Sequence, residues 1–343
     1  MRGIGMNRLI EAGKFTFLFF AASLSLATTT YAESPDDWPI HSPEAVGLSS
    51  ERLKQAADDA RSAAFRYCFT VIKDGALVYD RNYFGNANQS FTAYSVTKTI
   101  AAIVVGIAQY DGYLSLDDKV TDWLEDLPAA MNPDATIRHV LGQVSESSSL
   151  GEGSGFSYNS GEVINTLGII LSRATGMSSA DYAQQVLFNR LNMNDSEWAT
   201  DNDSNILIGY GARSSCRDIA RVGQLMLNGG VWEGQRLLDE NYITEMTRPS
   251  YPSANSNYGY LTWLNQSNGT WHRPLVSGDD IMVRGAPRNA YFATGFFGQL
   301  IIIVPDDNIV VTSMGWTPNL ETLNTLQKVW DAVQPALPTT PAE

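Results

Sequence analysis

The stretch that most constrains the fold is residues 100–108, IAAIVVGIA, which has no charged or polar side chain. Surface helices are usually apolar along one stripe only, so a segment that is apolar on every side belongs inside a core. We therefore expect a buried helix here. Ser95 and Lys98 stand just before this run, and their spacing of three places both side chains on one face of a first helical turn.

Ser95 and Lys98 are a candidate catalytic pair. A lysine in apolar surroundings loses affinity for its proton and can act as a base near neutral pH. A serine at the first turn of a helix gains from that base and from the positive end of the helix dipole. The spacing is short and carries little weight by itself. The position ahead of an apolar helix, where a solvated lysine is not expected, supports Ser95 as a nucleophile and Lys98 as its base.

Strand signals occur near both ends of the chain. Residues 67–73 and 76–84 surround Asp74-Gly75, which predicts a hairpin. Beyond residue 258 we expect strands at 258–264, 291–293, 299–304 and 308–313. Helical patterns fill most of the remainder, at 51–63, 117–127, 137–142, 162–174, 179–190, 217–228 and 320–336. This order predicts an α+β fold (an α/β sandwich), with an antiparallel sheet built from both chain ends, flanked by helices, and an inserted, mainly helical lobe.

The first 32 residues have the layout of a secretory signal peptide. Three basic residues precede an apolar run at 15–27, and a Thr-rich exit leads to Ala32. A membrane anchor would need about 20 apolar residues, so we expect cleavage after Ala32 and export to a periplasm or the outside, with no membrane span left. Residues 33–343 are predicted to form one domain, with sheet parts at about 45–110 and 255–336 and the helical lobe at about 111–254.

Charge and metal-ligand content exclude several function classes. The net charge is −14, and loss of the predicted signal peptide, with three bases and one acid, would make it −16. Such a charge argues against nucleic acid or an anionic membrane as a partner. Only two cysteines and three histidines are present, so we expect no metal or other cofactor. In an oxidising compartment Cys68 and Cys216 could pair, although the sequence does not give their distance.

Two further stretches carry candidate chemistry. Residues 156–162, FSYNSGE, place Tyr158 on a loop before a helix, where its phenol could relay a proton. Residues 291–299, YFATGFFGQ, read as a strand whose glycines allow another backbone to approach closely. A backbone N–H of this strand could join that of Ser95 in holding an oxyanion.

In this order, the three stretches resemble the serine β-lactamase and penicillin-recognising superfamily, specifically its class C-like and esterase branch. Residues 158–162, 217–225 and 293–299 are similar to the versions of these motifs in 6-aminohexanoate-dimer hydrolases and related esterases. The resemblance extends from about residue 45 to residue 336. It implies a β-lactamase/transpeptidase-like fold.

The resemblance also implies roles for individual residues. Ser95 would be the acylated nucleophile, Lys98 its base and Tyr158 the proton relay, and no cofactor would be required. By position, the N–H groups of Ser95 and Phe296 would form the oxyanion hole. Further candidates for substrate contact are Tyr94, Ser160, Thr294, Gly295 and Phe297.

The chain also departs from the pattern of cephalosporin-hydrolysing members. These usually carry Tyr-x-Asn where residues 158–160 are Tyr-Asn-Ser, and Lys-Thr-Gly where residues 293–295 are Ala-Thr-Gly. The missing lysine normally meets the substrate carboxylate, so Ala293 argues against β-lactams. Many relatives have Ser-Gly where this chain has Ser145-Glu146. Two interpretations of Glu146 remain open, a solvated loop acid and a group that binds a substrate amine.

We therefore expect an exported serine hydrolase that acts on small carboxylic esters or amides through an acyl-enzyme. One alternative is a β-lactamase or D-amino-acid peptidase, and another is a catalytically silent homologue that binds cell-wall peptides. The Gly-x-Ser-x-Gly elbow and the dinucleotide fingerprint are both absent from the sequence. The oligomeric state cannot be predicted.

Overall fold

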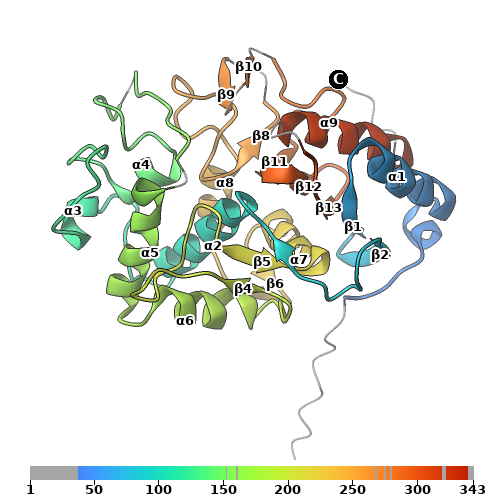
Figure 1. Ribbon diagram of the computed structural model, residues 1–343, viewed down its shortest axis with the longest axis horizontal. Coiled ribbons are helices and arrows are strands. Elements are labelled where there is room, and N and C mark those ends of the chain that lie inside the picture. The colour runs from blue at the N-terminus through green and yellow to red at the C-terminus, as the bar shows by residue number, and fades with distance from the viewer. Residues whose placement is uncertain are drawn as a thin grey trace, which may run out of the picture. The chain divides into compact units, whose positions relative to one another are not determined.

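A computed structural model describes residues 38–151, 153–159, 161–266, 269–273, 276–278, 280–318 and 322–338, all within one compact unit (Figure 1). The predicted signal peptide (residues 1–32) and Ser160 lie outside the described residues. Among those described, no helix is both long and apolar enough to cross a membrane.

Both ends of the described chain contribute strands to one six-stranded sheet in the order β2-β1-β13-β12-β11-β8. Every neighbouring pair is antiparallel. The strands are β1 (Arg66–Lys73), β2 (Ala76–Asn82), β8 (Trp263–Leu264), β11 (Tyr291–Gly295), β12 (Gln299–Val304) and β13 (Ile309–Gly315). The predicted sheet is confirmed. Its first hairpin turns at Asp74 and Gly75, both with positive φ, the conformation that an Asp-Gly turn favours.

Helices cover the sheet. α1 (Ser50–Ala63) and α9 (Thr322–Val333), from opposite ends of the chain, lie side by side (Figure 1). α7 (Cys216–Leu227) packs on β1, β12 and β13. Gly223 makes this packing close, because a Cβ at that position would lie 2.6 Å from a methyl group of Val310.

The apolar run predicted to be buried belongs to α2 (Val96–Tyr110). Every residue from 96 to 108 is buried, so the prediction is confirmed. α2 lies against β11, β12 and α5 (Glu162–Thr175), between the sheet and the helical lobe. The first turn of α2 is thus held where three parts of the chain meet.

The lobe between β2 and β8 is mainly helical and also contains short strands. Its other helices are α3 (Val120–Trp123), α4 (Ile137–Leu141), α6 (Ser179–Ala183), which continues as a π-helical turn over Gln184–Phe188, and α8 (Glu240–Met246). Three short strands form a second sheet: β3 (Phe91–Thr92), β5 (Ala212–Ser214) and β4 (Glu197–Trp198).

Two-stranded ribbons are formed by β6 (Val231–Trp232) with β7 (Gln235–Arg236) and by β9 (Trp271–Arg273) with β10 (Val276–Gly278). Single 3₁₀ turns lie at Pro43–Val46, Phe296–Gly298 and Gln334–Ala336.

Two predicted elements are much shorter than expected. The helix expected at 117–127 is reduced to α3, because the backbone at 118–120 pairs with residues 135–137 through Val120 N to Ala135 O and Ile137 N to Asp118 O. The strand expected at 258–264 is reduced to β8, since Leu261 has φ +49° and cannot continue a pleated strand. In both cases tertiary contacts override the local pattern.

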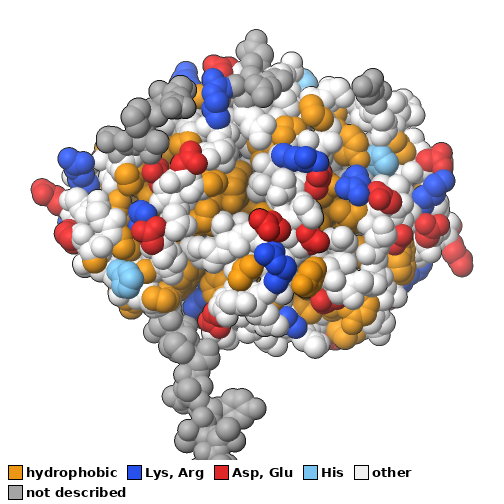
Figure 2. Space-filling model, turned by 180° about the vertical axis from the view of Figure 1, so that it is seen from behind, with side chains coloured by type: hydrophobic (Ala, Val, Ile, Leu, Met, Phe, Trp, Pro, Cys, Tyr) orange, Lys and Arg blue, Asp and Glu red, His pale blue; other side chains and the backbone are white. Residues whose placement is uncertain are grey.

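On the face of the molecule shown in Figure 2, Lys and Arg side chains are scattered among Asp and Glu and do not gather into a basic patch. A clustered basic patch is the usual footprint of a nucleic-acid-binding surface. This face offers no such footprint.

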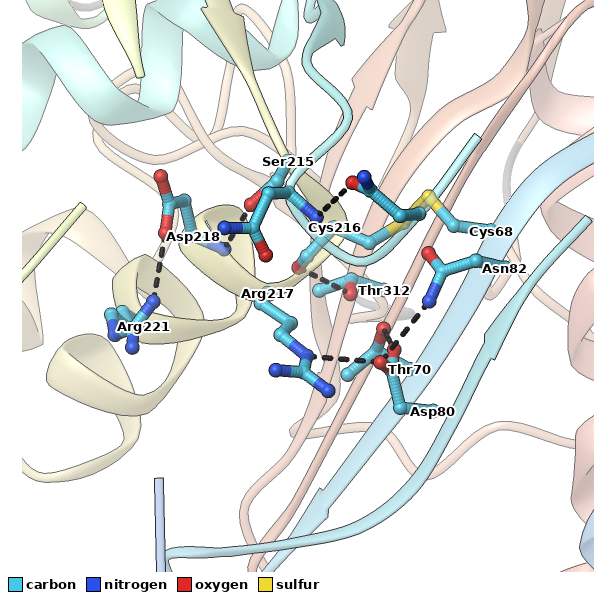
Figure 3. Close-up of polar contacts among 12 residues, drawn as sticks. Cys68, Thr70, Asp80, Asn82, Ser215, Cys216, Arg217, Asp218, Arg221 and Thr312 are labelled. Atoms are coloured by element: carbon cyan, nitrogen blue, oxygen red, sulfur yellow. Dashed lines mark hydrogen bonds and ion pairs between the residues drawn. A yellow bond between two sulfur atoms is a disulfide. The ribbon is translucent and has the colours of Figure 1, made fainter. Parts of the chain in front are cut away.

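A disulfide and an ion pair fix α7 to the sheet (Figure 3). Cys68 on β1 and Cys216 at the start of α7 are bonded, with their Cα atoms 6.3 Å apart and a sequence separation of 148. Beside this bond, Arg217 Nε lies 2.9 Å from Asp80 Oδ2, and Thr70 Oγ1 donates to Asp80 Oδ1 at 2.7 Å. Cys68 and Thr70 are two residues apart on β1 and therefore face the same helix.

Replacing both cysteines, as Cys68→Ser/Cys216→Ser, should lower the free energy of unfolding by about 2–5 kcal/mol, because the bond closes a long loop in the unfolded chain. Urea unfolding of the oxidised protein measures the change. Wild type in dithiothreitol should show the same loss, and the double variant should not respond to dithiothreitol. Equal midpoints for oxidised wild type and the double variant would contradict the expectation.

Candidate active site

The structure brings Ser95 and Lys98 into contact at the head of α2. Lys98 Nζ lies 3.1 Å from Ser95 Oγ and donates to the carbonyl oxygen of Gly209 at 2.9 Å. Ser95 is the N-cap residue of α2, but its side chain makes no capping hydrogen bond. Its hydroxyl is therefore oriented by Lys98 and not by the helix backbone.

Lys98 is buried, with only 1 % of its surface exposed. Burial lowers the pKa of Lys98, while the nearby phenol of Tyr158 opposes that shift. The sequence predicted this direction from the apolar run alone. A lysine whose pKa is lowered gives up its proton more readily, and its neutral amine can accept a proton from a neighbouring hydroxyl.

Tyr158 lies on the other side of the amine. Lys98 Nζ is 4.6 Å from the centre of the Tyr158 ring, and that ring stacks on Trp263 with centroids 5.5 Å apart. Tyr258 meets the same ring edge-on at 6.3 Å. Ser95, Lys98 and Tyr158, predicted from separate motifs, thus lie together.

Tyr158 lies on a loop that is fixed by hydrogen bonds to Glu146 and Gln143. Ser157 Oγ donates to Glu146 Oε2 at 3.0 Å and Asn159 Nδ2 donates to Glu146 Oε1 at 2.7 Å. Gln143, which is buried and has φ +58°, accepts from the backbone N–H of Ser157 through its carbonyl and from that of Asn159 through its side chain. Glu146 is therefore not simply a solvated loop acid, since it bridges both neighbours of Tyr158.

The predicted Thr-Gly strand approaches the head of α2. A Cβ on Gly295 would overlap the carbonyl oxygen of Ala93 and lie 3.1 Å from the backbone nitrogen of Ser95. Only glycine lets β11 come this close. The next residue is Phe296, so its backbone lies near that of Ser95, with which it was predicted to form the oxyanion hole. Among the described residues, neither has a backbone acceptor.

The turn that contains Phe296 is held in place by hydrogen bonds from two buried side chains, Arg66 and Gln299. Arg66, which is buried, donates to the carbonyl of Gly298 and, through Nε, to Ser313 Oγ at 3.0 Å. Gln299 Nε2 donates to the carbonyl of Phe296 at 3.1 Å. The sequence did not single out Arg66, because a basic residue at the start of a strand is normally solvated.

Thr294 has a cationic partner that the sequence did not reveal. Arg273 on β9 donates through Nη2 to Thr294 Oγ1 at 2.8 Å, and its guanidinium stacks on Trp263 at 4.2 Å. Burial lowers the pKa of Arg273 to about 10. Ala293, which stands where cephalosporin-hydrolysing relatives carry a lysine, is buried in β11. A positive charge nevertheless reaches the Thr-Gly motif from another strand.

Two of the remaining candidates, Tyr94 and Phe297, contact each other beside Ser95. Their rings are 5.1 Å apart, edge to face, and both residues have positive φ, +48° and +63°. Aromatic residues rarely adopt this backbone conformation, and such strain is concentrated at functional sites. Among the described residues, no cluster of His, Cys, Asp or Glu could hold a metal ion.

The fold and this arrangement of residues define the β-lactamase/transpeptidase-like class. A family model described as Beta-lactamase matches residues 52–318, most of the chain, and the chain therefore belongs to this family. The resemblance predicted from the motifs is confirmed. Membership supports a hydrolase in general terms.

Solved structures share the fold at low sequence identity. A Bacillus anthracis protein named as a 6-aminohexanoate-dimer hydrolase is 17 % identical with a TM-score of 0.64, and the match covers 82 % of this chain and 83 % of that chain. A family VIII carboxylesterase is 15 % identical, with a TM-score of 0.64 and coverage of 85 % and 99 %. A β-lactamase from Mycobacterium bovis is 16 % identical, with a TM-score of 0.60 and coverage of 79 % and 95 %.

The bridge at Glu146 yields a test of how Tyr158 is positioned. Glu146→Ala should lower kcat/KM for ester hydrolysis by about 10-fold, because a small misplacement of a reacting group is costly. Glu146→Gln should retain most activity, since an amide can still bond both Ser157 and Asn159. In a Tyr158→Phe background the Ala substitution should cost little more. An additive loss in the double variant would contradict this role.

Proposed function

We propose that this protein is an exported serine hydrolase that cleaves carboxylic esters or amides through an acyl-enzyme on Ser95. The observation that carries the proposal is the buried amine of Lys98, 3.1 Å from the Ser95 hydroxyl. Family membership and the esterase and amide-hydrolase names of similar structures support the substrate class. The Cys68–Cys216 disulfide supports an oxidising compartment and thus export.

The mechanism follows from the positions of these groups. Neutral Lys98 accepts the proton of Ser95 as Oγ bonds to the substrate carbonyl carbon. The carbonyl oxygen becomes an oxyanion and receives hydrogen bonds from the N–H groups of Ser95 and Phe296. Tyr158, in contact with Lys98, passes the proton to the leaving alcohol or amine, whose bond to the carbonyl carbon then breaks. Water then attacks the acyl carbon and gives a proton to the Tyr158–Lys98 pair. The bond from that carbon to Ser95 Oγ breaks, Oγ takes the proton back from Lys98, and the acid leaves.

A β-lactamase or D-amino-acid peptidase is the second candidate, and Arg273 is the observation that favours it. These enzymes act on substrates with a carboxylate, which in cephalosporin-hydrolysing relatives meets the lysine that Ala293 replaces here. Arg273, bonded to Thr294, brings a positive charge to the same motif. We rank this candidate second because Arg273 is buried and already donates to Thr294.

One experiment separates the candidates. Purified protein and Ser95→Ala are incubated with p-nitrophenyl butyrate, a linear amide dimer and a chromogenic cephalosporin. We expect ester or amide hydrolysis that falls by at least about 10³-fold in Ser95→Ala. Cephalosporin turnover alone would favour the second candidate. No turnover of any substrate would leave a silent homologue that binds cell-wall peptides.

The pH profile tests Lys98 as the base. The reaction needs the neutral amine, so kcat/KM should fall as the pH drops through the pKa of Lys98, which burial places below the usual 10.5. Rates for p-nitrophenyl butyrate between about pH 5 and about pH 10 provide the profile. Lys98→Arg, which stays protonated, should be inactive throughout. A rate that falls steadily as the pH rises would contradict Lys98 as the base.

A further inference from the structure

Two adjacent groups of partly exposed aromatic rings extend outward from the candidate active site. No ring of either group is fully buried, and three of the rings expose about half or more of their surface: Phe65 (54 %), Phe84 (60 %) and Trp316 (48 %). We name the set the aromatic shelf, and its members are Phe65, Tyr67, Phe84, Phe91, Tyr94, Phe297 and Trp316.

The inner end of the shelf adjoins the nucleophile. Tyr94 directly precedes Ser95, and its ring contacts that of Phe297 at 5.1 Å. Phe297 in turn stacks on Trp316, with centroids 6.1 Å apart and planes only 15° from parallel. Phe297 also follows Phe296, whose N–H is proposed for the oxyanion hole. A group attached to a carbonyl at Ser95 therefore meets aromatic surface at once.

The outer end lies across the start of β1 and the loop after β2. Tyr67 stacks on Phe91 with centroids 4.6 Å apart, and Phe84 and Phe65 lie 5.7 Å and 6.0 Å from the Tyr67 ring. The two ends are joined, because the backbone N–H of Trp316 donates to the carbonyl of Phe65 at 2.9 Å.

Packing against the core does not account for most of these rings, although Phe91 does contact the core. Rings that are packed only to stabilise the fold are normally buried, whereas these stack on one another and remain accessible to solvent. The positive φ angles of Tyr94 and Phe297 add a backbone cost at the inner end. An exposed apolar surface that begins at a catalytic serine is suited to a ligand.

We propose that the aromatic shelf binds the long apolar or aryl part of the ester or amide whose carbonyl is attacked by Ser95. This inference rests on the proposed function and narrows its substrate class to extended apolar substrates. We assign the substrate's own apolar chain to the shelf because the inner rings of the shelf begin at Tyr94, the residue next to Ser95. The chain could belong to the acyl side or to the alcohol side of the ester, and the test has an arm for each.

The test compares chain lengths. In the first arm, kcat/KM is measured for p-nitrophenyl acetate, butyrate and decanoate, and in the second arm for ethyl acetate and decyl acetate. In at least one of the two arms, the wild-type protein should have its highest kcat/KM for the ester with the longest chain. Phe84→Ser and Trp316→Ala should each lower the long-to-short ratio of kcat/KM about 5- to 10-fold, as expected when one ring's contact with the chain is lost.

The matched control is Tyr110→Ser. Tyr110 exposes 45 % of its surface, a fraction similar to the 48 % of Trp316. It is the last residue of α2 and lies about 20 Å from Ser95. Its substitution should leave the ratio unchanged. The proposal for the shelf is overturned if the wild-type protein shows no preference for chain length in either arm. It is also overturned if Phe84→Ser and Trp316→Ala keep the wild-type long-to-short ratio of kcat/KM. No hydrolysis of any ester by wild type would instead overturn the proposed function, so the two failures are distinguishable.

Discussion

The arrangement depends on an amine buried at Lys98. Taking a charged ammonium group out of water is costly, and in the protein interior a lysine escapes much of that cost by giving up its proton. The all-apolar helix that follows supplies the burial, and Ser95 Oγ and Gly209 O supply hydrogen-bond partners for Nζ. The same burial that would destabilise a charged lysine lowers the pKa of Lys98, as its proposed role as a base requires. Stability and chemistry are thus connected at a single side chain.

The second constraint is the close approach of two backbones. β11 reaches the head of α2 only because Gly295 has no Cβ to meet Ala93 and Ser95. This contact places Phe296, the next residue, near the backbone of Ser95, and the buried side chains of Arg66 and Gln299 donate to the carbonyls of Gly298 and Phe296 in the same turn. The helical lobe contributes Tyr158, which rests on the rings of Trp263 and Tyr258. Three distant parts of the sequence therefore converge on one hydroxyl.

Local patterns were sufficient for the buried helix and for the contact between Ser95 and Lys98, because each depends on spacing within one element. For the sheet, local patterns predicted most of the strands, and the presence of strands at both chain ends predicted that the two ends share one sheet. The strand expected at 258–264 was too long because Leu261 turns the chain, which hydrophobicity does not reveal. Arg273, Glu146 and Gln143 could not be assigned from the sequence, since each acts on a residue of another element. Glu146 did leave a signal, as a carboxylate where many relatives have glycine, but its partners at Ser157 and Asn159 became visible only in three dimensions.

The most direct test of the central claim is to locate the nucleophile chemically. The protein is incubated with a p-nitrophenyl alkylphosphonate, which leaves a stable adduct on an activated serine, and is then analysed by peptide mass spectrometry. We predict one adduct per chain, on the peptide that contains Ser95, with none in Ser95→Ala and much slower formation in Lys98→Met. An adduct on another residue, or equal labelling of Ser95→Ala, would contradict the account.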